Sequence, residues 1–220
     1  MKRYIVFALL LCVTFTALAV DLNRDGRDSA YVETILKRSQ KIVDKLDIRD
    51  SEVSKQVLHI IANRYFLLND IYEVRDQKVK DAKAKLSGDA KQAAITAAEN
   101  EKDAKLYRHH FEFAADLSLY LSPEKVDEVK DGMTYNSLKV QYESLCDMIP
   151  SLTEEEKAQV YAWYKEAREF AMDAENSNKK HGFFNKYKGR INNYLAKRGY
   201  DLVKERNAWY ERLKAQGKKF

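Results

Sequence analysis

The segment from residue 178 to residue 201 carries the residue types best suited to chemistry in this sequence. Its cations and amides recur at helical spacing, which places Lys186, Arg190 and Asn193 on one polar face. Tyr187 and Tyr194 border that face. Arginine and lysine bind carboxylates, asparagine bonds to hydroxyl groups, and aromatic rings stack on sugar faces. The segment therefore predicts a site for an acidic polymer, and the alternative is a solvated helix face without a ligand.

Other cations fall on predicted apolar faces. Lys188 shares a face with Phe184. In the helix predicted from residue 51, Arg64 and Arg75 lie within about 40° of Leu68 on a helical wheel. An inward charge must be paired or must face a cavity. The arginines therefore indicate either an anion or glycan site or an ion pair between helices.

One histidine, His110, is predicted on an apolar helix face with Phe113 and Leu117. Its side chain suits a general base or a metal ligand, because its proton is exchangeable near neutral pH. The alternative is a core histidine whose hydrogen bonds are satisfied within the protein.

These residues define one enzymatic hypothesis, which is cleavage of an acidic polysaccharide. A lyase needs cations to neutralise a uronate carboxylate and a base to take the adjacent proton. A hydrolase needs two facing carboxylates, and the 34 acidic residues do not select a pair. The cations available to a lyase are Arg75, Lys188 and Arg190, and the bases are His110, His181 and Tyr187.

Several chemistries are excluded by the motifs that the sequence lacks. It has no glycine-rich phosphate loop, no His-Glu-x-x-His pair, no Cys-x-x-Cys pair and no Gly-x-Ser-x-Gly elbow. With two cysteines and four scattered histidines, we expect no metal site and no cofactor. The basic residues form no dense patch, so we expect no nucleic-acid partner.

The first 19 residues read as a secretory signal peptide. Lys2 and Arg3 precede an apolar run, and the small residues Ala17 and Ala19 mark a cleavage site. Cleavage lowers the formal charge from +5 to +3, since it removes two cations. We therefore expect a periplasmic or extracellular protein without a membrane span in its mature chain, beginning with a flexible leader at residues 20–27.

The elements that must position these residues are predicted to be helices. The chain has only seven glycines and two prolines, too few for the turns of a sheet-rich fold. We expect one all-α domain over residues 28–220, an irregular bundle of six to eight helices. Caps are predicted at Asp28 or Ser29, Asp50 or Ser51, Asp89, Ser122, Thr153 with Glu156, and Asp201.

Three finer expectations concern the connections and one buried ring. Residues 78–105 are rich in alanine, lysine and glutamate, so they are predicted to form the tip of a long helical hairpin. Residues 133–135 are predicted to be extended, and residues 176–181 are predicted to be a polar break before a helix that begins at Phe183. The helix that follows Thr153 is predicted to bury Phe170.

Several runs together resemble a secreted bacterial family, domain of unknown function 3826. The resemblance covers nearly the whole mature chain and implies an exported protein in bacteria that devote many exported proteins to plant and host glycans. It implies no activity. The runs are Asn69–Ile71 with Arg75–Asp76, Lys130–Tyr135, Met148–Thr153, Ala167–Asp173 and Lys186–Leu195.

A weaker likeness links the run from Leu152 to Lys157 to periplasmic helical chaperones with a Leu-Thr-x-x-Gln motif, although the glutamine is missing here. Three hypotheses follow. The first is a non-catalytic binding or accessory protein in glycan utilisation, with an acidic or plant-type glycan as partner. The second is an enzyme that acts on acidic polysaccharide. The third is a chaperone that uses the hairpin as a cradle.

Overall fold

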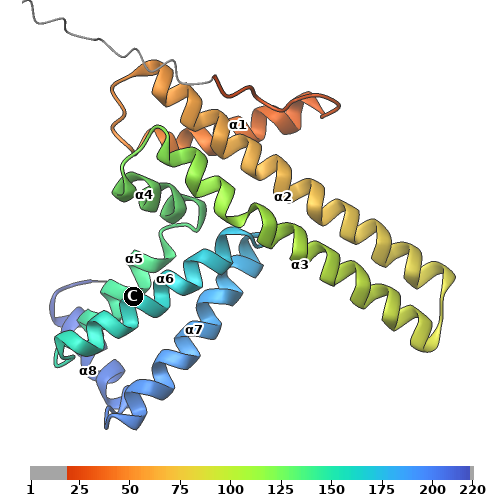
Figure 1. Cartoon of the computed structure of the whole chain (residues 1–220). Coiled ribbons are helices and arrows are strands. Elements are labelled where there is room, and N and C mark those ends of the chain that lie inside the picture. The colour runs from red at the N-terminus through yellow and green to blue at the C-terminus, as the bar shows by residue number, and fades with distance from the viewer. Residues whose placement is uncertain (1–18, 219–220) are drawn as a thin grey trace, which may run out of the picture.

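The computed structural model describes residues 19–218, and this part of the chain forms eight α-helices without a strand (Figure 1). The predicted all-α, multi-helix class is confirmed. The predicted signal peptide lies outside the described residues except for its last residue. The helices are α1 (Ser29–Val43), α2 (Ser51–Lys85), α3 (Gly88–Ser118), α4 (Pro123–Met133), α5 (Ser137–Met148), α6 (Glu154–Met172), α7 (Ser177–Lys197) and α8 (Leu202–Ala215).

Local cap chemistry sets most of the helix starts. A helix leaves its first backbone N–H groups without partners, and a short polar side chain just before the helix accepts from them. The Thr153 hydroxyl accepts from the Glu156 N–H, and the Glu156 carboxylate accepts from the Thr153 N–H, which confirms the predicted capping box. Side chains also cap α1, α2, α4 and α8, and these are Asp28, Asp50, Ser122 and Asp201.

Three local predictions were wrong. Helix α7 begins at Ser177, because the Asn176 side chain accepts from the Lys179 N–H and so starts the helix earlier than expected. Helix α3 begins at Gly88 after Ser87, so Asp89 lies inside the helix. Tyr135 and its neighbour at residue 136 have left-handed backbone angles, φ 59° and 54°, and form a turn where an extended segment was predicted.

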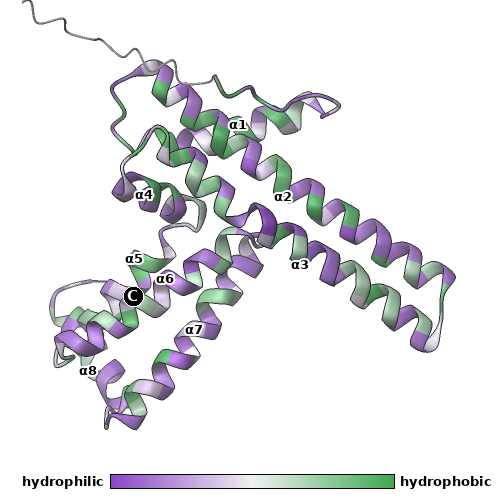
Figure 2. Cartoon of the chain, in the orientation of Figure 1, coloured by the Kyte–Doolittle hydropathy of each residue, from purple (hydrophilic) through white to green (hydrophobic). Residues whose placement is uncertain are grey.

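Helices α2 and α3 pack side by side as the long hairpin that the sequence predicts, and its tip projects from the remaining helices (Figure 1). The part of α2 near the tip is mostly hydrophilic (Figure 2). Two alanines, Ala82 and Ala98, are buried there, so the helices pack through small side chains. The Lys78 ammonium also pairs with Glu101 across the hairpin.

The segment before α1, predicted as a flexible leader, lies against α2. The Asn23 N–H donates to the Asn63 side chain at 2.8 Å, and the Arg27 guanidinium makes two 2.7 Å bonds to the Asp70 carboxylate. The main-chain oxygen of Val20 lies 2.6 Å from Nδ1 of His59. These contacts tie residues 20–27 to the hairpin.

Two groups of helices each surround a core of their own. Helices α1–α4 bury one set of apolar side chains, whose members include Leu46, Val57, Ile61, Leu117, Val129 and Met133. Helices α5–α8 bury a second set, whose members include Ile149, Val160, Tyr164, Phe184, Ile191 and Leu195. Each fully buried aliphatic side chain contributes roughly 1.5–3 kcal/mol. The groups meet along α6, which runs from the second core to the first.

No helix among residues 19–218 is long and apolar enough to cross a bilayer.

Candidate functional site

The junction between the two groups of helices contains buried charges beside Met172 of α6, which packs in the first core. Arg168 of α6 has a side chain that is 1% exposed, and it bonds to Asp127 and Asp131 of α4 at 2.6 and 2.9 Å. Arg64 of α2 is 2% exposed and pairs with Asp173, which follows α6. Buried charges need partners of opposite sign. The junction therefore fixes how α6 sits against α2 and α4.

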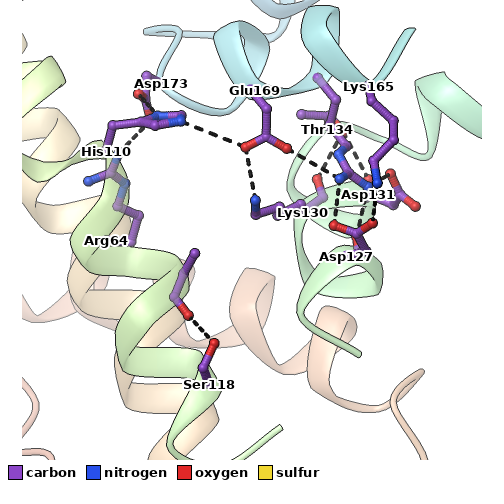
Figure 3. Close-up of polar contacts among 12 residues, drawn as sticks. Arg64, His110, Ser118, Asp127, Lys130, Asp131, Thr134, Lys165, Glu169 and Asp173 are labelled. Carbon is purple, nitrogen blue, oxygen red and sulfur yellow. Dashed lines mark hydrogen bonds and ion pairs between the residues drawn. The ribbon is translucent and has the colours of Figure 1, made fainter. Parts of the chain in front are cut away.

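Asp173 joins the end of α6 to the hairpin. One of its carboxylate oxygens lies 2.7 Å from Nδ1 of His110 on α3, and the other pairs with Arg64 (Figure 3). Its main-chain oxygen accepts from the Tyr72 hydroxyl at 2.8 Å. Three side chains from the two hairpin helices therefore hold this one residue.

Glu169, one turn before Asp173, lies between His110 and Lys130 (Figure 3). Its carboxylate accepts from Lys130 Nζ at 2.9 Å and from Arg168 at 3.2 Å. The same carboxylate lies 3.7 Å from Nε2 of His110. His110 thus lies between two carboxylates, each of which is held by a cation.

A cavity of about 550 Å³ lies beside His110, Glu169 and Asp173, between α3 and the α6–α7 pair. We call it the aromatic cleft, because aromatic side chains from several helices line it, among them Tyr107 and Phe111 from α3, Phe170 from α6 and Phe183 from α7. Tyr107 is 72% exposed, Phe111 63% and Phe170 51%. Phe170 and Phe183 stack at 5.7 Å, with their planes 13° apart. Large rings that face solvent around one cavity make it the candidate binding site.

Beside these rings the aromatic cleft is lined by Leu106, Ala174 and several polar side chains, among which Lys102 is paired with acids. Lys102 bonds to Glu99 and to Asp103, both at 2.9 Å. Burial raises the pKa of Tyr72 to about 12, so this phenol stays protonated at neutral pH. The cleft therefore offers ring faces together with hydrogen-bonding groups whose charges are already compensated.

The structure places His110 at this cleft rather than in the core. Phe170, predicted to be buried, is instead exposed on the cleft wall. Arg75 is not in the cleft, because its guanidinium pairs with Asp76, Glu99 and Glu175 and so ties α2 to α3 and to the chain after α6. The interhelical ion pair considered for Arg75 is the arrangement observed.

The residues predicted on the polar face of α7 lie away from the cleft. Lys186 and Asn193 are exposed, and Arg190 pairs with Glu166 at 3.2 Å while its guanidinium lies 4.6 Å from the Trp163 ring. These contacts tie Arg190 to α6.

Two further residues of α7 also differ from expectation. Tyr187 is buried in the second core, where burial and a hydrogen bond with Glu166 raise its pKa to about 12. Lys188 was expected on the apolar face but is exposed, and it borders a separate cavity with Trp209. Arg75 and Lys188 therefore lie at different places, and the structure does not assemble the lyase site outlined from the sequence.

The cleft rings were missed as a group because they come from three helices. Tyr107 and Phe111 are spaced i, i+4, which puts them on one face of α3, and this spacing was the available signal. It does not reveal that Phe170 and Phe183 face them across a gap.

A family model with the description "Protein of unknown function (DUF3826)" matches residues 32–215. The chain belongs to this family. The DUF3826 match runs from the first turn of α1 to the end of α8, so it includes both cores and the whole aromatic cleft. No curated protein matches the chain.

The described part of this DUF3826 chain holds no group of three or more histidine, cysteine, aspartate or glutamate side chains arranged to bind a metal ion. The two carboxylates beside His110 are instead engaged with Arg64 and Lys130.

Proposed function

We propose that this DUF3826 protein is an exported glycan-binding protein that holds its ligand in the aromatic cleft. The observation that carries the proposal is the set of exposed rings around one cavity of about 550 Å³. Sugar rings present apolar C–H faces that stack on aromatic side chains, and a ligand there shields rings that are otherwise wetted.

The polar groups of the cleft favour a neutral glycan over an acidic one. Asp103, Glu169 and Asp173 line it, against Lys102 and His110 as the basic residues. A uronate carboxylate would approach these acids without a free cation to meet it, and like charges repel. Sugar hydroxyls, in contrast, both donate and accept, so they match imidazole and carboxylate groups.

The role proposed for the site is binding without catalysis. Asp173 is held by Arg64 and Tyr72, and Glu169 by Lys130, so both carboxylates act as fixed acceptors. The signal-peptide pattern of residues 1–19 supports a periplasmic or extracellular location, where a glycan-binding protein meets polysaccharide before its import.

A second candidate function, cleavage of the same glycan, is favoured by one contact. A histidine oriented by a carboxylate, as His110 is by Asp173, is the arrangement of many general bases. Incubation of the protein with a polysaccharide that it binds separates the candidates. New reducing ends that disappear in His110→Ala would support the enzyme, and their absence in the wild type would support binding alone.

The test of the binding proposal is native affinity electrophoresis of residues 20–220. The gels contain neutral polysaccharides (arabinan, galactan, xylan and xyloglucan) or acidic ones (polygalacturonate and alginate). We expect at least one neutral polymer to retard the protein, and we expect Phe170→Ala to remove the retardation. The matched control is Tyr161→Ala, since Tyr161 is also an exposed ring on α6 but packs with Tyr142 outside the cleft.

Two outcomes would overturn the proposal. Migration unaffected by every polymer would remove the glycan role, and suppression of the aggregation of an unrelated protein would then favour the chaperone hypothesis. Equal retardation of the Phe170→Ala variant and the wild type would show a glycan role that lies elsewhere on the molecule.

A further inference from the structure

A second cleft of about 560 Å³ lies between α1, α2 and the start of α7, and it shares Tyr72 and Ala174 with the aromatic cleft. We call it the lysine cleft, because Lys180 lines it. Four tyrosines and one arginine contribute to its walls: Tyr31, Tyr65, Tyr72, Tyr135 and Arg38.

Lys180 is an unusual residue for the wall of a cleft. It is only 5% exposed, and its Nζ donates to the main-chain oxygen of Met172 at 3.0 Å. An ammonium group has three donors, and among residues 19–218 the structure gives it this one neutral acceptor. Burial lowers the pKa of the amine to about 8, so it remains largely protonated at neutral pH. Two of its donors therefore have no hydrogen-bond partner among the described residues, and an anion is the partner that such a buried cation favours.

No carboxylate among the described residues pairs with the Lys180 ammonium. Asp173 attracts the ammonium, but its carboxylate is engaged with Arg64 and His110. The other carboxylates of the cleft have partners of their own. Asp76 and Glu175 pair with Arg75, and Glu73 accepts from Asn69.

Arg38 supplies a second cation to the same cleft. Its guanidinium lies 5.4 Å from the centre of the Tyr65 ring, and the structure shows it no carboxylate within residues 19–218. The Tyr135 ring stacks on His181 at 5.7 Å, and its left-handed backbone places it at the same cleft. Backbone strain of this kind collects at sites of function.

We propose that the lysine cleft binds an oxyanion borne by a small ring, with Lys180 and Arg38 holding the charge and the tyrosines packing against the ring. The shared chemistry is that of a carboxylate, as in a uronate, or of a sulfate or phosphate ester. This site does not depend on the proposed binding of a neutral glycan, because different residues carry it.

The experiment is calorimetric titration of residues 20–220 with D-galacturonate, inorganic sulfate and inorganic phosphate, with D-glucose as the uncharged control. We expect saturable binding of at least one anion and none of glucose. Galacturonate alone would identify a carboxylate site, and sulfate or phosphate alone would identify an ester site. Lys180→Met and Arg38→Gln are each expected to weaken binding ten-fold or more.

The matched control is Lys179→Met, because Lys179 is the adjacent lysine of α7 and is exposed to solvent. It should bind like the wild type. Circular dichroism checks that each variant folds, and the exposed Arg38 provides a second, independent variant on the other wall of the cleft.

No heat with any of the three anions would overturn the proposal, as would unchanged binding in Arg38→Gln. Neither result bears on the aromatic cleft, whose test uses Phe170→Ala and neutral polymers.

Discussion

At the scale of the single residue, the buried ammonium of Lys180 lowers the stability of the folded protein at neutral pH. Its pKa is about 8 in the folded protein against 10.5 for a free side chain. Below pH 8 both states carry the charge, and the folded state bears the full unfavourable cost of burial. Between pH 8 and 10.5 the folded protein releases the proton first, so the stability contributed by this residue rises with pH, by about 3 kcal/mol in all.

Lys180→Met is therefore expected to stabilise the protein most at pH 7. The free energy of unfolding of the variant minus that of the wild type should fall by about 3 kcal/mol between pH 8 and 10.5. Urea titrations at a series of pH values measure this difference. The pKa values of Tyr65 and Tyr72 are raised to about 12, so above pH 10 these tyrosines lower the stability of the folded protein as the pH rises. Both the variant and the wild type contain them, so they do not affect the difference. A difference in the free energy of unfolding that does not change with pH would show that burial does not lower the pKa of Lys180.

Asp173 gives a second prediction at this scale. Asp173→Asn keeps the shape of the side chain but leaves the buried Arg64 without its anion, so we expect a loss of about 3 kcal/mol in the free energy of unfolding. Urea unfolding at pH 7 measures it. The control is Glu143→Gln, whose carboxylate pairs with the exposed Lys139, and it should lose less than about 1 kcal/mol. Equal effects of the two changes would refute the central place given to Asp173.

At the scale of the element, the contact of α4 with α1 depends on a glycine. A Cβ atom on Gly132 would lie 2.9 Å from Cγ2 of Ile42 on α1. We expect Gly132→Ala to lower the free energy of unfolding by about 1–2 kcal/mol, because overpacking outweighs the gain in helix propensity.

Gly189 on α7 is the matched control, since nothing lies within 4 Å of a Cβ placed there. Gly189→Ala should raise stability by about 1 kcal/mol through helix propensity alone. Thermal unfolding of both variants checks the pair, and stabilisation by both changes would show that α4 moves freely away from α1.

The start of a helix can be predicted from the sequence where it depends on residues that are close together in the chain. Asp28, Ser122 and the Thr153–Glu156 box were identifiable because a cap and its N–H partners lie within three residues. The start of α7 was misplaced, because the polar residues after Asn176 have the composition of a loop and are helical through a cap that the pattern did not single out.

The candidate site was less predictable, for a physical reason. His110 was identified by its type, but its partner Asp173 lies 63 residues further along the chain. The exposure of Phe170 depends on how far α3 stands from α6, which is a property of packing between elements. Helical periodicity reports the face of one helix and does not report the space between two.

At the scale of the whole molecule, a charged junction joins two separately packed groups of helices. Arg168→Met removes the buried cation that pairs with Asp127 and Asp131 at this junction and leaves Lys165 as the remaining partner of Asp127. We expect a loss of about 3 kcal/mol and a loss of cooperativity between the groups.

Both tryptophans, Trp163 and Trp209, lie in the α5–α8 group, so fluorescence reports that group while far-ultraviolet circular dichroism reports all helices. In the wild type the two urea transitions should coincide, and in Arg168→Met they should separate. The control is Lys157→Met, which lies on the surface of the same helix and pairs only with Glu154 in this structure. Coincident transitions in Arg168→Met would show that the apolar contacts alone couple the two groups.

Glycan binding in the aromatic cleft can be measured as the dissociation constant of an oligosaccharide of the retarding polymer, by calorimetry. We expect Phe170→Ala and Phe111→Ala each to weaken binding about five-fold to thirty-fold, since loss of a stacked ring removes about 1–2 kcal/mol, while Tyr161→Ala binds like the wild type. Wild-type affinity in both cleft variants would contradict glycan binding in this cleft.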